Sequence, residues 1–336
     1  MSAIHGFKNV VKTVKVTRLS FCLGLLLMLG LSAAPAQAQL NRTWVSSTGN
    51  DANTCSQASP CATFSGAHGK TNAGGEVNCL DSGSYGQFTI TKAISIICEG
   101  VVGGVLVSGG TGIFINGGAN DVVHLRGLDI EGIGIALAGV YFGSGAALHI
   151  ENCRIRDFTF SGNGGWGIEF LPASAAELYV TDTTISHNGS PAFGAGIVVY
   201  AAAGSTSKVV INRSDVQNNV TGIKADGVNS GAGGVINMTV SDTASVGNSQ
   251  NGIVGTTNAG GSAAVIMVDR AKASHNAVGY GIIADGPKTF IRFGASSITG
   301  NAFGVGASNG GTLLSYGTNQ IDGNSVDGTP ATIALK

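Results

Sequence analysis

Short runs of alternating apolar and polar residues recur along most of the chain at a nearly constant spacing. Each run has two apolar residues separated by one variable residue, then a polar corner and a further apolar position. The runs lie at residues 123–130, 148–155, 178–185, 209–216, 238–245, 266–273, 291–298 and 314–321. Their last residues are 25, 30, 31, 29, 28, 25 and 23 positions apart. Alternation with a period of two predicts β-strands, and repetition at this length predicts a stack of similar units.

A second apolar run follows most of these units and usually begins with glycine. These runs open at Gly139, Gly167, Gly196, Gly222, Gly252, Gly281 and Gly304. A short helix is expected only near residues 63–71. Strands that repeat in this way cannot bury their inner faces alone, so each unit must stack on the next. The pattern predicts an all-β parallel β-helix, with one inward column from Val123 to Leu314 and another from Leu125 to Tyr316.

Three further sets of residues each occupy one repeat position and so form a column along the stack. Asparagine, which tolerates the left-handed backbone of a tight corner, predicts a structural ladder of stacked amides; its members are Asn188, Asn219, Asn248, Asn276, Asn301 and Asn324. Small residues aligned with Cys153 predict a buried, inert thiol. A mixed column is read as exposed ion pairs, with a charged substrate rail as the alternative; its members are Asn152, Asp182, Arg213, Asp242 and Arg270.

Composition narrows the protein class. Of 336 residues 54 are glycine, without the strict every-third period of collagen, 43% are apolar and 11% are charged. The apolar share is too high for a disordered chain. The apolar run at residues 19–31 has 13 residues, fewer than the ~20 that a membrane span needs.

The N-terminus has the features of a secretory signal peptide over residues 1–38. Four basic residues precede the apolar run, and the sequence Ala36-Gln37-Ala38 predicts cleavage near Ala38. An uncleaved anchor is the alternative. Cleavage leaves 18 − 4 = 14 basic residues against 19 acidic ones, a net charge of −5. We therefore expect a secreted or periplasmic protein without a transmembrane segment, and no nucleic-acid partner.

Five cysteines remain after cleavage. Cys55 and Cys61 bracket a short loop, and Cys79 and Cys98 lie in neighbouring apolar segments. An exported chain favours disulfides between the members of each pair, with Cys153 free. A zinc site is disfavoured, because no Cys-x-x-Cys and no paired histidine lies nearby.

The units of alternating residues, polar corner, Asn and Gly-Ile resemble the repeats of the pectin-lyase-like superfamily, which are right-handed parallel β-helices. The resemblance covers about residues 77–321, and upstream Trp44-Val-Ser-Ser-Thr-Gly-Asn-Asp and Pro60-Cys-Ala-Thr-Phe64 look like the N-terminal cap of secreted members. It implies a single-stranded right-handed parallel β-helix with an N-terminal cap. We divide the chain into a cap segment at 39–75, the β-helix at 76–325 and a C-terminal tail at 326–336.

Enzymes of this superfamily usually act on acidic polysaccharides, but their linear signatures are missing from this sequence. It has no adjacent aspartates, no Gly-His-Gly, no Asp-Pro-His-Asp and no calcium nonapeptide. No metal and no cofactor is indicated. A polysaccharide lyase or hydrolase activity stays open, because acids from different coils can meet in space.

The best candidate site is the outward face of the first strand column. His124 and Arg126, His149 and Glu151, and then Tyr179 occupy equivalent positions on three successive units. His149 and Glu151 are the catalytic candidates, because they can move a proton near neutral pH. His124, Arg126 and Tyr179 are the substrate-binding candidates: the tyrosine can pack on a sugar ring and the arginine can pair with a uronate carboxylate. A polar surface without function is the alternative.

Two further outward residues, Tyr141 and Glu169, are expected on a different face. The sequence thus predicts an exported β-helix protein that binds or modifies a polysaccharide or a cell-surface glycan. The alternative is a structural or adhesive repeat protein of the cell surface, which the low charge and small side chains favour.

Overall fold

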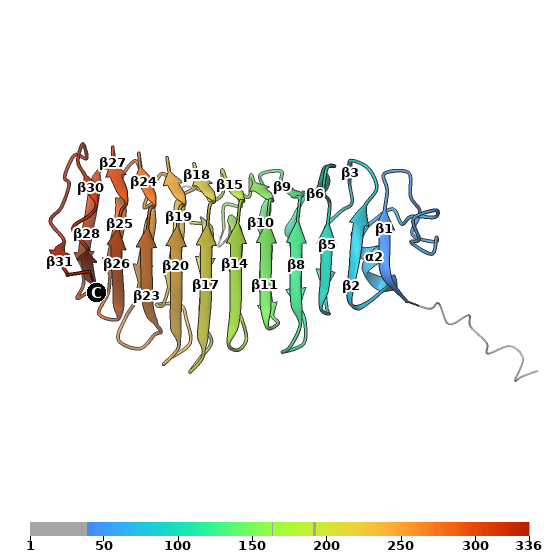
Figure 1. Cartoon of the computed structure of the whole chain (residues 1–336), viewed down its shortest axis with the longest axis horizontal. Helices are drawn as coiled ribbons and strands as arrows, with labels where there is room; N and C mark the ends of the chain where they lie inside the picture. Colours follow the sequence, from blue (N-terminus) through green and yellow to red (C-terminus); the bar gives the residue numbers. More distant parts are fainter. Residues whose placement is uncertain (1–38, 163, 191–192, 336) are drawn as a thin grey trace, which may run out of the picture. The chain divides into compact units, whose positions relative to one another are not determined.

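The computed structural model describes residues 39–335 except residues 163 and 191–192, and the expected signal peptide at 1–38 lies outside the described residues. Residues 39–335 form a coil of three parallel sheets, which run along the length of the coil (Figure 1). We number the sheets in the order in which each turn of the chain visits them. Because neighbouring strands of each sheet belong to successive turns, the architecture is the expected right-handed parallel β-helix.

Sheet 1 has twelve strands in the described part of the chain. Its members are β1 (Leu40–Val45), β2 (Thr71–Cys79), β5 (Ile94–Ile97), β8 (Val122–Arg126), β11 (Ala147–Glu151), β14 (Ala176–Thr181), β17 (Thr206–Asn212), β20 (Val235–Ser241), β23 (Ala263–Asp269), β26 (Thr289–Gly294), β29 (Thr312–Ser315) and β31 (Ala331–Thr332).

Sheet 2 has short strands. Its members are β3 (Gly83–Ser84), β6 (Gly103–Val107), β9 (Leu128–Gly132), β12 (Arg154–Arg156), β15 (Thr184–Ser186), β18 (Asp215–Gln217), β21 (Ala244–Val246), β24 (Lys272–Ser274), β27 (Ser297–Thr299) and β30 (Gln320–Ile321). Sheet 3 closes each turn. Its members are β4 (Phe88–Ile90), β7 (Gly110–Asn116), β10 (Ala136–Ser144), β13 (Trp166–Phe170), β16 (Ala195–Val199), β19 (Thr221–Asp226), β22 (Ile253–Thr256), β25 (Tyr280–Asp285) and β28 (Phe303–Ser308).

Each repeated run of the sequence folds as two strands rather than one, so a turn has three strands. The break between sheets 1 and 2 contains one residue in the left-handed region, for example Asp182 with φ 50° or Arg213 with φ 46°. The mixed column that includes these residues forms the expected exposed ion pairs. Arg213 Nη2 lies 2.8 Å from Asp182 Oδ2, and Arg270 Nε lies 2.7 Å from Asp242 Oδ1.

The core consists of the inward residues of all three sheets. Ile150, Val180 and Ile211 are in register on successive strands of sheet 1, and each has 0% exposure. The expected columns are wrong at the last unit, where Ile291 pairs with Leu313 and Arg292 pairs with Leu314. Leu313 and its neighbour are both apolar, so alternation alone could not choose between them, and the pairing turns the second leucine outward.

The asparagine ladder is present at the corner between sheets 2 and 3. Each Nδ2 donates to the Oδ1 of the next asparagine at 2.8 to 3.3 Å, from Asn188 to Asn324, where Asp327 Oδ1 accepts the last bond. The left-handed residue at this corner is the one before the ladder, such as His187 with φ 56°, and not the asparagine as expected. The amides point into the coil and satisfy buried backbone groups that the corner would otherwise leave unpaired.

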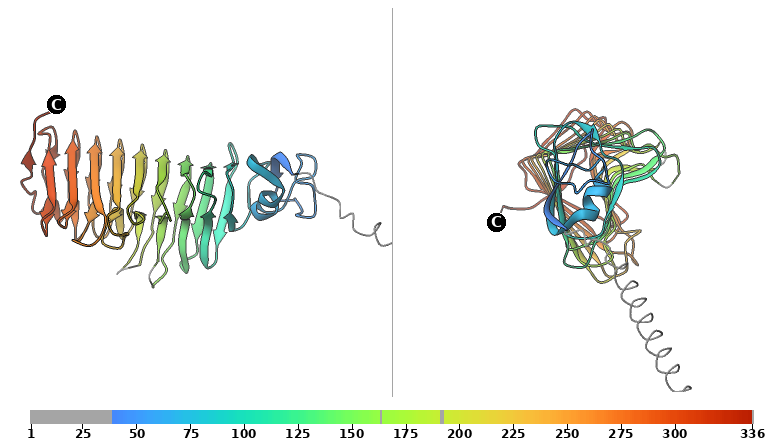
Figure 2. Two further views of the ribbon diagram at one scale, coloured as in Figure 1. Left: turned by 90° about the horizontal axis from the view of Figure 1, so that it is seen from below. Right: turned by 90° about the vertical axis from the view of Figure 1, so that its right-hand side faces the viewer.

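The N-terminal end of the coil is closed by α2 (Phe64–Lys70), which lies within the outline of the coil in the end-on view of Figure 2. Phe64 packs against Tyr85 and Phe88, with ring centroids 5.1 and 5.2 Å apart. Thr63 caps the helix, since its Oγ1 accepts a hydrogen bond from Gly66 N at 2.9 Å.

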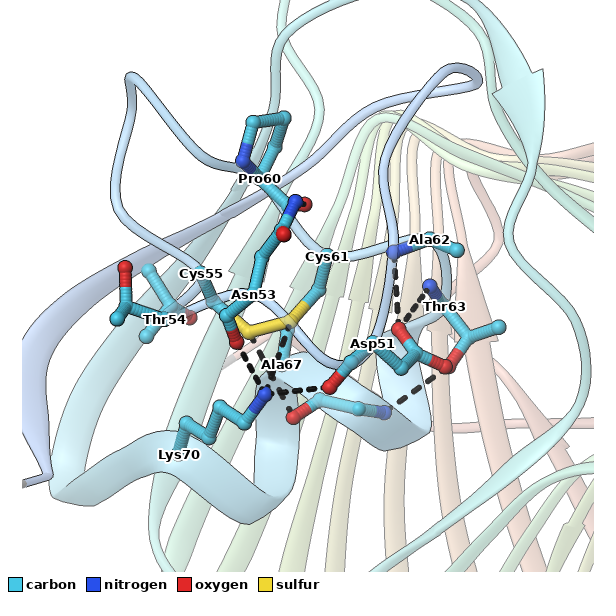
Figure 3. Close-up of a disulfide and its surroundings, with 12 residues drawn as sticks. Asp51, Asn53, Thr54, Cys55, Pro60, Cys61, Ala62, Thr63, Ala67 and Lys70 are labelled. Carbon is cyan, nitrogen blue, oxygen red and sulfur yellow. Dashed lines mark hydrogen bonds between the residues drawn. A yellow bond between two sulfur atoms is a disulfide. The ribbon is translucent and has the colours of Figure 1, made fainter. Parts of the chain in front are cut away.

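Both expected disulfides are present at this end. Cys55 is bonded to Cys61, and Cys79 to Cys98 on the adjacent rung, with Cα atoms 4.7 and 4.9 Å apart. Figure 3 shows the first disulfide beside Lys70, whose Nζ donates to the backbone carbonyls of residues 51 and 53. Cys153 is a free, buried thiol, and burial raises its pKa to about 12.

Strand pairing extends beyond the segment expected to form the coil. β1 and β2 belong to sheet 1 although residues 39–75 were expected to form a cap, and β31 in the expected tail pairs with β29. The residues that the structure describes include no helix with the length and hydrophobicity of a membrane span.

Candidate functional site

The outer face of sheet 1 brings three of the expected site residues into one line. β8, β11 and β14 are successive strands of sheet 1 (Figure 1). Their pairing places His124, His149 and Tyr179 directly beside one another. Inward neighbours such as Leu148 and Ile150 have 0% exposure, which holds the strands in a register that turns the three rings outward. We call His124, His149 and Tyr179 the aromatic column.

The three rings of the aromatic column form a continuous stack. The ring centroids of His124 and His149 are 4.4 Å apart with planes inclined by 16°, and those of His149 and Tyr179 are 4.6 Å apart with planes inclined by 9°. These separations are close to the ~4.8 Å spacing of strands in a sheet. The stack therefore follows from placing flat side chains at one repeat position.

The two ends of the column differ. Beyond Tyr179 the next residue in register is Val210, whose branched side chain is larger than that of serine. Beyond His124 the next residue in register is Ser95, whose side chain is too small to cover an imidazole. His149 has a ring on each side, so it presents only its edge to a ligand. The other ring face of His124 has only the small Ser95 in register beside it on β5, and we call it the open face of His124.

Charged side chains flank the column along both of its edges. On one edge Arg126 lies in register with Glu151; its Nε is 2.8 Å from Glu99 Oε1, and its Nη1 is 4.0 Å from Glu151 Oε2. On the other edge Glu177 accepts a hydrogen bond from Tyr179 Oη at 2.7 Å and pairs with Lys208 Nζ at 3.0 Å. These exposed ion pairs order the side chains more than they stabilise the fold.

Burial and hydrogen bonding adjust the protonation of the column. The pKa of His149 is lowered, mainly by burial and then by His124, against the smaller opposing effects of Glu151 and Glu177. Its imidazole is therefore neutral at pH 7, with one nitrogen free to accept a proton. The hydrogen bond between Tyr179 and Glu177 raises the pKa of the phenol and lowers that of the carboxyl.

The arrangement combines a proton acceptor, a carboxylate and a ring face within three rungs. His149 and Glu151 lie on the same face of β11, two residues apart, so a hydroxyl held between them can meet a base and a hydrogen-bond acceptor. The open face of His124 offers a flat surface to a sugar ring.

Sequence reasoning missed the three charged partners of the column. Glu177 is two residues before Tyr179, so period two already places it on the outer face, and Lys208 is its register partner on the next strand. Glu99 had no such signal, because it follows the end of β5.

Tyr141 and Glu169 lie in register on sheet 3, away from the column, as the sequence indicated. Burial raises the pKa of Glu169 to about 7.

Within residues 39–335, apart from 163 and 191–192, no three His, Cys, Asp or Glu side chains are grouped so that they could hold a metal ion.

Comparisons with known proteins give likenesses of structure alone. No protein-family model and no curated protein sequence matches the chain. Solved structures similar to it include pectate lyase Pel9A, at 15% identity and a TM-score of 0.42, covering 88% of this chain and 78% of that one.

Two further similar structures are the Dettilon tailspike protein and endopolygalacturonase I from Stereum purpureum. The tailspike is 12% identical with a TM-score of 0.44, covering 76% of this chain and 61% of that one. The endopolygalacturonase is 12% identical with a TM-score of 0.37, covering 85% and 97%. With TM-scores of 0.44 or less, these likenesses carry no conclusion about activity. The parallel β-helix that the resemblance to the pectin-lyase-like superfamily implied is present, and the strand pairing itself establishes it.

Proposed function

We propose that the protein is exported and binds or modifies a polysaccharide or a cell-surface glycan on the outer face of β8, β11 and β14. The observation that carries this proposal is the stack of His124, His149 and Tyr179, bordered by exposed charged groups. A sugar chain lying along the coil meets one outward side chain about every 4.8 Å. A row of stacked rings with hydrogen-bonding edges suits such a ligand.

The open face of His124 is the first contact that we assign to a sugar ring. The ring would lie over Ser95, with the imidazole edge of His149 and the carboxylate of Glu151 on the following rung. If the bound glycan is also hydrolysed, a water oxygen bonds to the anomeric carbon as the glycosidic C–O bond breaks. Neutral His149 takes a proton from that water, Glu151 accepts a hydrogen bond from it, and the departing sugar oxygen takes a proton from solvent. These roles fit a hydrolase; a lyase would need a uronate ring, because it removes a proton that the neighbouring carboxyl group acidifies.

Export is supported by the two disulfides and by the expected signal peptide. Disulfides persist in oxidising compartments and are rare in the reducing cytosol. Two bridges within residues 55–98 therefore favour a secreted or periplasmic location.

The proposal is tested by screening the purified protein against an array of glycans and following each hit with a reducing-end assay. Ser95→Tyr adds a fourth ring over the open face of His124, and we expect it to weaken binding at least about tenfold. His149→Ala, Glu151→Gln and Tyr179→Ala should each reduce binding or turnover. A thermal melt of every variant separates loss of the site from loss of the fold.

Thr239→Ala is the matched control, since Thr239 occupies the same outward column two rungs beyond Tyr179. It should leave binding unchanged. If the site variants bind as well as this control, the site lies elsewhere. If the protein binds no glycan, the structural or adhesive role replaces this proposal.

A further inference from the structure

The charges around the aromatic column leave its face with more carboxylates than cations. Glu99, Glu151 and Glu177 lie beside the column, against Arg126 and Lys208. The imidazole of His149 adds no positive charge at pH 7, because burial lowers its pKa. A ligand that approaches this face therefore meets a net negative surface.

Both cations of this face, as the structure describes it, already have a carboxylate partner. Arg126 Nε is 2.8 Å from Glu99, and Lys208 Nζ is 3.0 Å from Glu177. A uronate would have to displace these partners or share them, and like charges next to one another oppose either arrangement. The pairing of Arg126 with a uronate, which the sequence suggested, therefore competes with a contact inside the protein.

Of the three carboxylates, Glu151 is the least engaged by cations and so the most available to accept hydrogen bonds from a ligand. Its nearest cation is Arg126 Nη1 at 4.0 Å, and 45% of its side chain is exposed. Its oxygens can accept hydrogen bonds from sugar hydroxyls, but they repel a second carboxylate.

From this charge arrangement we infer that the face selects a polysaccharide without acidic groups over a polyuronate of the same backbone. The inference rests on the proposed function and refines its substrate class. Uncharged sugar rings keep the ion pairs of Arg126 and Lys208 intact and use Glu151 as a hydrogen-bond acceptor. Acidic rings compete with these ion pairs and are repelled by Glu151.

The test compares two forms of one glycan, so that only charge differs. A neutral glycan found in the screen is oxidised at its primary hydroxyls to the uronate form, and an acidic glycan found there is converted to its methyl ester. At low salt we expect the acidic form to bind at least about tenfold more weakly. The difference should shrink at about 0.5 M salt, where exposed charges are screened.

Glu99→Gln frees Arg126 from its ion pair. The ratio of the affinities for the uncharged and the acidic form should therefore fall at least about threefold. Asp215→Asn is the control, because it removes one exposed carboxylate from β18 of sheet 2. The inference is overturned if the acidic form binds as tightly as the uncharged form, or if Glu99→Gln behaves like the control, while the proposed function stands. If neither form of any glycan binds, the proposed function fails and the inference with it.

Discussion

Replacing one amide of the asparagine ladder tests how the turns of the coil are held together. Asn248 has 0% exposure, and its Oδ1 accepts hydrogen bonds from Asn219 N at 3.0 Å and Asn219 Nδ2 at 3.3 Å. Its Nδ2 donates to Asn276 Oδ1 at 3.0 Å and to Ser245 Oγ at 3.3 Å. Asn248→Ala removes all four bonds.

The expected loss follows from which groups keep a partner. Asn219 Nδ2 still donates to Ile185 O, and Asn276 Oδ1 still accepts from the backbone N–H of residue 248. The backbone N–H of Asn219 loses its acceptor, and a buried donor without a partner costs about 1–3 kcal/mol. With about 1 kcal/mol for the remaining bonds, we expect the free energy of unfolding to fall by about 3 kcal/mol.

Asn237→Ala is the matched control. Asn237 lies in the same turn, exposed on the outer face of β20, and its replacement should cost less than about 0.5 kcal/mol. Guanidinium unfolding followed by far-UV circular dichroism measures both variants. A difference between them below about 1 kcal/mol would show that the ladder does not stabilise the coil as argued.

Three further predictions concern the core, a buried acid and a disulfide. Ile211→Asp, at a position with 0% exposure, should lower the free energy of unfolding by more than about 3 kcal/mol, whereas Val210→Asp on the outer face should cost far less; equal losses would mean that the register is wrong. The pKa of Glu169 is about 7 in the folded chain against 4.5 as its ordinary value, so its stabilising protonated form is lost as pH rises through 7. The free energy of unfolding of Glu169→Gln should therefore exceed that of the parent by about 2–3 kcal/mol at pH 8 and equal it at pH 4. If variant and parent were equally stable at both pH values, the burial argument would be refuted. Serine at both Cys79 and Cys98, which are 19 residues apart, should cost about 3 kcal/mol in denaturant unfolding, and no loss would mean that loop closure contributes nothing.

The sequence predicted the fold most reliably where apolar and polar residues alternate strictly. Leu148, Ile150 and their partners on β14 and β17 leave only one register that buries them, and that register is observed. The prediction failed at Leu313 and Leu314, where either residue can face inward. It also missed the third strand of each turn, because Arg213 in a left-handed conformation gives no local signal.

The candidate site was predictable only as far as it depends on repeat position. His124, His149 and Tyr179 share one position, so their stacking follows from the strand spacing. The pairing of Arg126 with Glu99 depends on where a side chain outside the repeat turns back, and no periodic pattern encodes that contact.

The asparagine corner has a consequence for how this protein can change in evolution. Successive asparagines of the ladder are 31, 29, 28, 25 and 23 residues apart, yet their amides meet with the same geometry. An insertion in one turn is absorbed by its loops, and the next asparagine restores the alignment before the following strand begins. Loops that border a binding face can therefore gain or lose residues, and whole turns can be duplicated, without changing the strand register of the turns that follow.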